Sequence, residues 1–400
     1  MKSEQTQLLD RPPRTFELFT PLAPGVLLFH RALVTEALSQ LSEFTLDMLS
    51  PNEDIDPDEM LGQRVSIRVE LPGQQERRFT GYVTSFAHVG MLGRYHHYQA
   101  DVRPWFWFLT RTMDCRIFQN QTVPEIIKAV FGEHALADFK LELAGAYRKR
   151  GYCVQYRESD FDFLSRLMEE EGIYYYFRHG ERNNTLVLVD SMSAHSPFPG
   201  YEQLPFVPQG RLVRPEHEYV HAWEFKRAVK SGKVALSDYD FQRPSVDLQV
   251  ASAMQRKHEQ CESEIFDYPG TYYAGADGAH YAKTRVEALN VGHSQVTGKT
   301  NARGAAVGHV FTLLNHPRGD QNRQHLILAA THQMKNAEYE TTDSTETAGA
   351  EYQCAFTAQD SKEPFRPARV TRKPFVQGPQ TAVVTGPDGD EIHTDQFGRV

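Results

Sequence analysis

The sequence predicts a mainly β protein that carries a small α+β insert. Two observations support this fold class. Apolar and polar residues alternate with a period of two along short segments such as 65–71 and 79–86, and Gly and Pro turns separate these segments. That pattern is typical of antiparallel sheets with one face in water. Between residues 118 and 203 the alternation gives way to two segments with helical periodicity and capping residues, which marks the insert.

The N-terminal part supplies the strands of one β domain. Its last predicted strand ends in the aromatic run Trp105–Phe108. Clustered aromatic side chains of this kind favour a core or a subunit interface over a ligand site. The predicted strands are residues 27–38, 44–48, 65–71, 79–86 and 95–109.

A first helix is predicted to begin after Thr122. Glu125 stands three residues further on, which is the spacing of a capping box. Pro124 lies in the first turn, where a missing amide hydrogen costs nothing. The apolar face then consists of Ile126, Ile127, Val130 and Phe131.

A second helix is predicted between the cap Ser159 and Gly172, which stands at the usual C-cap position. Phe163 lies to one side of its apolar stripe. A strand at 173–177 follows at once, and residues 185–189 are predicted as its hairpin partner. The apolar stripe consists of Phe161, Leu164, Leu167 and Met168.

The acidic run Glu169–Glu171 ends this second helix. Three carboxylates at a helix C-terminus oppose the helix dipole. We expect a solvated helix end, and the electrostatic conflict leaves a contact surface as the other interpretation.

The C-terminal half returns to β structure, with a helix predicted at 281–289. Residues 341–350 are rich in Thr, Glu and Gly and are expected to form a surface loop. Pro364–Pro379 contains four prolines and is predicted to be an extended linker, and an Asp-Gly turn at residues 388–389 then predicts a hairpin. The predicted strands of this half are residues 234–241, 307–314, 326–331, 352–356, 381–385 and 391–394.

Composition excludes several classes of function. Asp and Glu outnumber Lys and Arg by 52 to 43, for a net charge of −9, which argues against nucleic acid or an anionic membrane as the main partner. No window approaches the apolar length of a membrane span, and Met1–Arg14 lacks the apolar centre of a signal peptide. The four cysteines form no CxxC pair, which favours isolated thiols in a reducing compartment.

One motif points to catalysis. His217-Glu218-Tyr219-Val220-His221 matches HExxH, in which two histidines one helical turn apart bind zinc and the glutamate activates water. Zinc binding by this motif requires a helix, which places both histidines on one face. The segment instead alternates between aromatic and other residues as a strand does, and on a strand Glu218 points away from His217 and His221. The residues therefore favour a strand, with a zinc metalloprotease as an alternative function.

Four segments occur in an order that matches a known protein family. They are Glu158–Phe177 (ESDFDFLSRLMEEEGIYYYF), Leu236–Phe241 (LSDYDF) closed by Pro244, Pro364–Val384 (which starts PFRP and ends QGPQTAVV) and Asp395–Val400 (DQFGRV). Together they resemble the VgrG family, which is related to the hub protein at the centre of contractile phage baseplates. The resemblance covers essentially the whole chain.

The resemblance implies two antiparallel β-barrels of the phage-hub type, with the α+β insert in the first, followed by an OB-like barrel and a β-helical needle. The needle is expected to lie beyond Val400. On this basis the expected domains are 1–117 (N-terminal part of the first barrel), 118–203 (insert), 204–245 (return to the first barrel), 246–363 (second barrel), 364–380 (Pro-rich linker) and 381–400 (incomplete start of the OB-like domain).

The resemblance also implies a structural protein rather than an enzyme. Such a protein is a homotrimeric spike of a type VI secretion system that caps a tube of hexameric Hcp rings, carries a PAAR tip protein, and delivers effectors with their adaptors. It is loaded in the cytoplasm and expelled without a signal peptide when the sheath contracts. No cofactor, metal or catalytic residue is implied. The alternative is the baseplate hub of a contractile phage-like particle.

Overall fold

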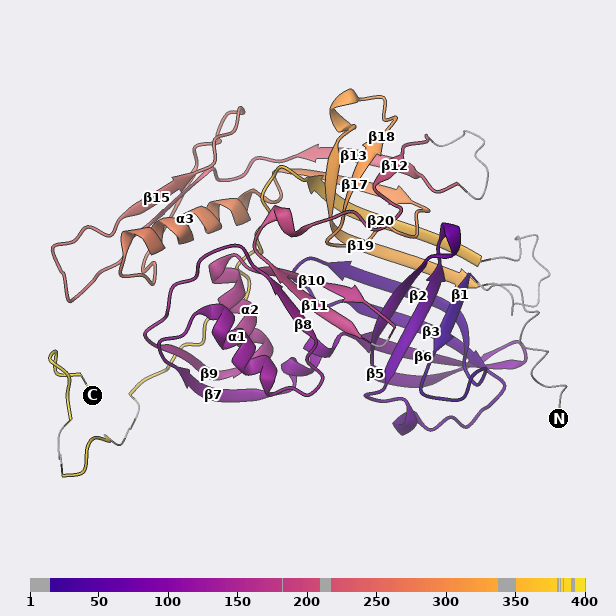
Figure 1. Ribbon diagram of the computed structural model, residues 1–400, viewed down its shortest axis with the longest axis horizontal. Helices are drawn as coiled ribbons and strands as arrows, with labels where there is room; N and C mark the ends of the chain where they lie inside the picture. Colours follow the sequence, from indigo (N-terminus) through magenta and orange to yellow (C-terminus); the bar gives the residue numbers. More distant parts are fainter. Residues whose placement is uncertain are drawn as a thin grey trace.

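The computed structural model describes residues 15–181, 183–208, 217–336, 350–379, 381, 383, 385–389 and 393–399. Its centre is one twelve-stranded, mostly antiparallel sheet that runs through two lobes (Figure 1). The first lobe consists of β1 (Phe16–Phe19), β2 (Leu28–Ala37), β3 (Glu43–Ser50), β4 (Arg64–Glu70), β5 (Glu76–Leu92) and β6 (Tyr95–Arg103). The second lobe consists of β12 (Gln203–Pro205), β13 (Val220–Arg227), β17 (Ser294–Thr300), β18 (Val310–Leu314), β19 (Gln324–Asn336) and β20 (Ala350–Asp360).

The two lobes share the sheet because β2 pairs antiparallel with β19, from Ala37 opposite Ala329 to Arg31 opposite Lys335. The order of strands is β1-β4-β5-β6-β3-β2-β19-β20-β17-β13, with β18 on β19 and β12 on β18. A bridge between Phe206 and Val220 links the β12 side back to β13, which closes the second lobe. Closure of this kind leaves few open strand edges.

The strands of residues 204–245 differ from the expected return to the first barrel. β13 pairs with β17 and β12 pairs with β18, and both partners belong to the second lobe. The reason is side-chain packing, since the Trp223 ring on β13 lies 4.9 Å from His325 and 6.1 Å from Phe356. These partners stand more than 100 residues further along the chain.

The insert packs two helices against short strands, as predicted. Thr122 and Glu125 form the expected capping box, Ser159 caps the second helix, and Gly172 ends it in the left-handed conformation with φ 75°. The insert starts slightly before residue 118, because β7 pairs with β9. Its elements are β7 (Met113–Phe118), α1 (Val123–Gly132), β8 (Phe139–Glu142), β9 (Cys153–Ser159), α2 (Asp160–Glu171), β10 (Tyr174–His179) and β11 (Asn184–Val189).

Two local predictions for aromatic residues need correction. The run Trp105–Thr110 is a 3-10 helix and not the end of a strand, because Pro104 lacks the N–H that would continue the ladder after Arg103. The core interpretation of Trp105 is confirmed, since the ring is 1% exposed. In α2, Phe163 is fully buried, stacked 5.5 Å from Phe118, whereas Phe161 is only partly buried.

A small distal subdomain extends from the second lobe, at the left of Figure 1. A three-stranded sheet in the order β15-β14-β16 packs against a helix there. The helix predicted at 281–289 is confirmed, but the strand predicted at 234–241 ends at Leu236 because Asp238 turns to bind the amides of Thr271 and Tyr272. The elements are β14 (Lys233–Leu236), β15 (Val250–Ala253), β16 (Glu264–Asp267) and α3 (Gly275–Asn290).

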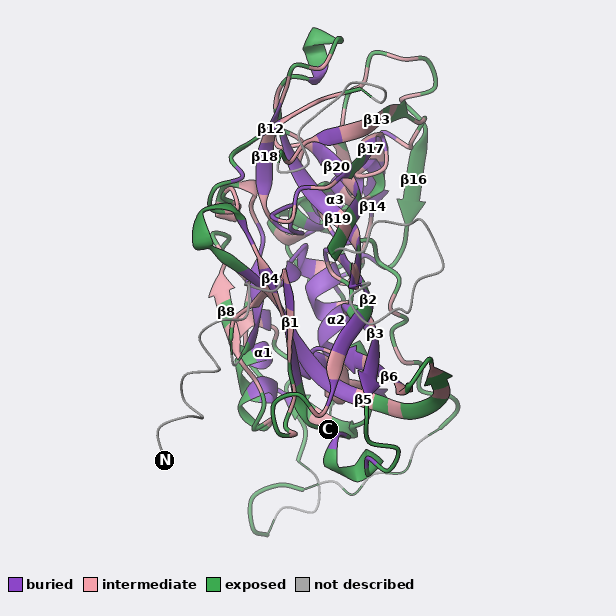
Figure 2. Ribbon diagram, turned by 90° about the vertical axis from the view of Figure 1, so that its right-hand side faces the viewer, coloured by how far each residue is buried: buried purple, intermediate pink, exposed green. Residues whose placement is uncertain are grey.

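Beyond β20, the described residues form no helix or strand. The loop predicted at 341–350 lies almost wholly outside the described residues, as does much of the hairpin predicted at 381–394. The first half of the Pro-rich linker is not a free spacer, since Phe365 and Pro367 are buried. In the described part of the chain, none of the helices has the length and apolar character needed to cross a bilayer. Figure 2 shows how burial is concentrated in the sheet and in the insert helices.

Candidate functional site

The HExxH segment does not form a zincin helix. His217–Tyr219 lies in a loop and Val220 begins β13. The Glu218 carboxylate accepts a hydrogen bond from Arg303 at 2.6 Å, so it is held in an ion pair with a distant loop. Burial lowers the pKa of His221. Among the residues that the structure describes, no three His, Cys, Asp or Glu side chains are grouped to hold a metal ion.

Three other features stand out among the described residues, and the first is a buried charge cluster. Glu36 on β2 lies at its centre. One of its carboxylate oxygens is 2.8 Å from His179 of β10, and the other is 3.2 Å from His332 of β19 and 3.3 Å from Arg77 of β5. The cluster therefore joins the first lobe, the insert and the second lobe at one point.

Arg77 extends this cluster by donating two hydrogen bonds of 2.8 Å to the carbonyl oxygens of Arg303 and Ala305. Burial by itself raises the pKa of Glu36, but hydrogen bonds from His179 and His332 hold it well below its ordinary value. Burial and the Arg77 charge lower the pKa of His332 to about 4. The buried Glu36 carboxylate is thus hydrogen-bonded by one permanent cation and two imidazole rings, which favours one relative position of the three parts.

The second feature is a clamp on the linker at the end of α2. Glu169 accepts hydrogen bonds from the amides of Val370 and Thr371 at 3.1 and 3.0 Å, and from the Thr371 hydroxyl at 2.7 Å. Arg366 binds Glu287 of α3 at 2.8 Å and the carbonyl oxygen of Gly172 at 3.0 Å. Residues 364–371 are therefore fastened to both the insert and the distal subdomain.

The other two acids of the run are also engaged. Arg150 lies 2.8 Å from Glu170 and 2.6 Å from Glu171. Thr271 donates to Glu170, and the Tyr281 hydroxyl donates to Glu171. The expectation of a solvated helix end at Glu169–Glu171 is wrong, because cations and amides from distant segments offset the unfavourable interaction with the helix dipole. The interpretation as a contact surface is correct, and the contact is within the chain.

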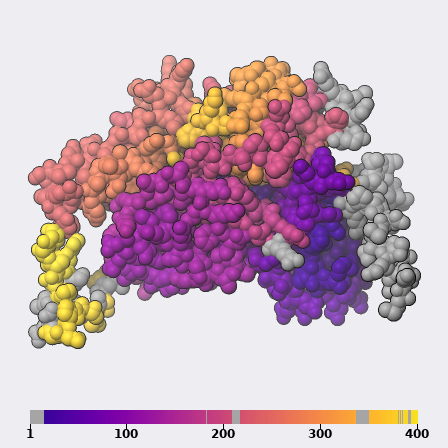
Figure 3. Space-filling model, viewed as in Figure 1, coloured from indigo at the N-terminus to yellow at the C-terminus, as the bar shows by residue number. Residues whose placement is uncertain are grey.

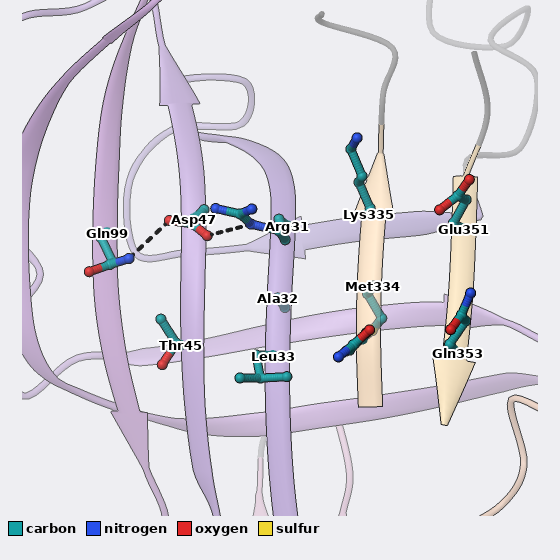
Figure 4. A pocket seen from close by; sticks show the side chains of 11 residues that line it. Arg31, Ala32, Leu33, Thr45, Asp47, Gln99, Met334, Lys335, Glu351 and Gln353 are labelled. Atoms are coloured by element: carbon teal, nitrogen blue, oxygen red, sulfur yellow. Dashed lines mark hydrogen bonds and ion pairs between the residues drawn. The ribbon is translucent and has the colours of Figure 1, made fainter. Parts of the chain in front are cut away.

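The third feature is the open face of the sheet between the lobes. A shallow hollow of about 490 Å³ lies over β6, β3, β2, β19 and β20 (Figure 4), and a second hollow of about 440 Å³ lies over β19, β20, β17 and β13. Side chains that alternate outward on neighbouring strands line both hollows. Most are small or uncharged, as with Thr45, Leu33, Gln333, Thr331 and Thr357.

Charged side chains line both hollows: Arg31, Asp47, Lys335 and Glu351 in the larger, and Glu224 and Lys299 in the smaller. Arg31 and Gln99 converge on Asp47, at 2.9 and 3.1 Å, and His97 reaches the same carboxylate at 3.0 Å. Burial raises the pKa of Asp47, but the hydrogen bonds from Arg31 and Gln99 outweigh burial and lower it. The face therefore offers a broad sheet surface in which charged side chains of both signs are mixed with small and uncharged ones.

Comparison with known proteins agrees with this description. Residues 35–338 match the family model described as phage tail baseplate hub (GPD). The type VI secretion system spike protein VgrG1c of Pseudomonas aeruginosa is 43% identical over 393 residues, which are 98% of this chain and 54% of that protein. Spike protein VgrG1a of the same organism is also 43% identical, over 97% of this chain and 60% of its own length.

The chain thus spans little more than half the length of these relatives. Among solved structures, a type VI secretion component of E. coli, described as similar to the bacteriophage T4 tail proteins gp27 and gp5, matches with a TM-score of 0.65. The match covers 89% of this chain and 80% of that one at 20% identity, so it shows a β-rich fold of the hub type. The chain belongs to the phage tail baseplate hub family, and the relatives that it resembles in sequence are the VgrG spike proteins.

Proposed function

We propose that this chain is the hub region of a type VI secretion spike and acts as a homotrimer. The observation that carries the proposal is the nearly full-length similarity to VgrG spike proteins. The two lobes support it, because each contributes six strands to the sheet, so that three copies would present six β lobes to a six-fold tube.

The role is structural. The spike caps a tube of Hcp rings, accepts a PAAR protein at its tip, and carries effectors with their adaptors into a target cell. It is assembled in the cytoplasm and expelled on contraction. The buried charge cluster and the linker clamp support this role, since both fasten segments that would otherwise shift against each other under load.

The open sheet face is the contact for a neighbouring copy. Many of its side chains are small and uncharged, as at Thr45, Thr331 and Thr357, and they permit close approach. Leu33 stands in the larger hollow with 42% of its surface exposed. A charge at this position would be desolvated in the trimer and solvated in the monomer, so it should weaken assembly alone.

Native mass spectrometry tests the proposal. Three chains of 45.7 kDa give 137 kDa. The wild type should show this mass, and Leu33→Arg should shift it toward the monomer. Met91→Arg should not, because Met91 is an exposed apolar side chain (61% exposed, against 42% for Leu33) that lies outside both hollows. A stable monomer of the full natural protein would contradict the proposal, as would unchanged secretion of Hcp after deletion of the gene.

The matching family model is described as a phage tail baseplate hub, so a second candidate function is the hub of a contractile phage-like particle. Neighbouring genes for a sheath and a membrane complex would favour the secretion spike. Capsid and tail-fibre genes would favour the particle.

A further inference from the structure

The distal subdomain carries an exposed group of aromatic rings on two adjacent loops. We call Tyr239, Phe241, Tyr268 and Tyr273 the aromatic patch; their surfaces are 55%, 46%, 58% and 58% exposed. Exposed apolar clusters of this size mark contact sites more often than free surface. Neither the charge cluster nor the linker clamp involves these four rings.

The backbone beneath the patch is held in place. Asp238 accepts hydrogen bonds from the amides of Thr271 and Tyr272 at 2.5 and 3.2 Å. Arg243 binds Asp240 at 2.9 Å and donates to the carbonyl oxygen of Tyr273 at 2.9 Å. The aspartates of the LSDYDF motif thus tie the two loops together, and the aromatic residues between them face outward.

A short turn near the end of the described chain has a matching form. Asp395 accepts hydrogen bonds from the amides of Phe397 and Arg399 at 2.9 and 3.0 Å, and from the Arg399 guanidinium at 2.6 Å. Gly398 has φ 76°, a conformation that other residues rarely adopt. The Asp395–Arg399 turn is therefore organised by its own contacts.

This turn lies on the patch. The Phe397 ring meets the Phe241 ring edge to face, with centroids 5.4 Å apart and an interplanar angle of 81°. The Arg399 guanidinium lies 5.3 Å above the Phe241 ring. Figure 3 shows the yellow C-terminal segment against the salmon surface of the distal subdomain. Edge-to-face and cation–π geometries are the favourable arrangements for these groups.

We propose that Phe241, one ring of the aromatic patch, is the binding site for the Asp395–Arg399 turn of the same chain. The contact brings together two of the four segments that carried the family resemblance, although more than 150 residues separate them. The chain after the linker is then fastened at two places, by Glu169 at residues 370–371 and by Phe241 at residue 397. Together these contacts set the direction in which the chain leaves the hub, whichever machine the hub serves.

Hydrogen exchange on the full chain tests the contact. Phe241→Ala and Phe397→Ala should each lower the protection factors of residues 395–399 by roughly fivefold or more, and the double variant should lower them no further. Phe375→Ala is the matched control, because Phe375 is an aromatic residue of the same C-terminal segment with 81% of its surface exposed; it should change nothing. Unchanged protection in both single variants would refute the proposal.

A cross-link distinguishes contact within a chain from contact between copies. The exposed Cys115 is first replaced by serine, and cysteines are then placed beside the two rings, at the exposed positions 242 and 396, so that Phe241 and Phe397 are kept. A short bismaleimide should link them within one chain, which a denaturing gel shows as a monomer. A cross-linked dimer, formed also when the two single variants are mixed, would overturn the proposal in favour of a neighbouring copy.

Discussion

Glu169→Gln should release the linker from the hub without unfolding the hub. In the native chain one carboxylate oxygen accepts two amide hydrogens, from Val370 and Thr371, and the other accepts the Thr371 hydroxyl. A glutamine can turn its single acceptor oxygen toward the two amides and its NH2 group toward the Thr371 hydroxyl oxygen, so the substitution removes the negative charge from all three hydrogen bonds.

The magnitude follows from these contacts. Hydrogen bonds to a charged group contribute about 1.5–3 kcal/mol each and neutral ones about 0.5–1.5 kcal/mol, so loss of the charge costs about 1 kcal/mol or more at each of the three bonds. The linker is partly solvated, so water recovers some of this energy, and we expect about 2–4 kcal/mol. At about 1.4 kcal/mol per factor of ten, amide protection in residues 368–373 should fall by roughly 30-fold to 1,000-fold.

Hydrogen exchange followed by mass spectrometry measures this loss directly. Glu59→Gln is the control, because Glu59 is an exposed acid in a short 3-10 helix at Pro57–Glu59. Exchange in β19 should stay unchanged in both variants. If Glu169→Gln left residues 368–373 as protected from exchange as in the wild type, Glu169 would not fasten the linker to α2.

The buried cluster yields two further predictions, and the HExxH segment yields one. The pKa of His332 is about 4, below its ordinary 6.5. Below about pH 6.5 the unfolded chain therefore binds more protons at this site than the folded chain does. This difference alone should reduce the free energy of unfolding by about 2 kcal/mol as the pH falls from 7 to 5. His332→Gln should flatten the pH dependence by that amount in denaturant titrations, and an unchanged slope would contradict the assignment. Arg77→Met leaves Glu36 buried without its cation and should cost about 3–5 kcal/mol; the loss should be smaller in the double variant with Glu36→Gln, and strictly additive losses would argue against coupling. Zinc calorimetry should give the same weak heats for the wild type and for His217→Ala, whereas a tight one-to-one site that disappears in the variant would restore the metalloprotease.

Local features were predictable from the sequence because their causes lie within a few residues. The Thr122–Glu125 capping box, the Ser159 cap and the left-handed Gly172 each depend on a side chain or a dihedral angle at that position. The period-two alternation likewise identified the main strands, since it depends only on which face each residue presents. The order of four motifs then indicated the family.

The tertiary structure decided every feature that depends on the identity of a distant partner. From the sequence, Glu169–Glu171 is a solvated helix end. In the folded chain Arg150, Thr271 and Thr371 contact these acids, and all three come from other segments. In the same way, the sequence does not say which lobe β13 joins. The structure places it in the second lobe, where Trp223 packs against the rings of His325 and Phe356. Alternation gives the face that a strand buries but not the strand beside it, because pairing depends on side chains that lie a hundred or more residues away and meet only in the folded chain.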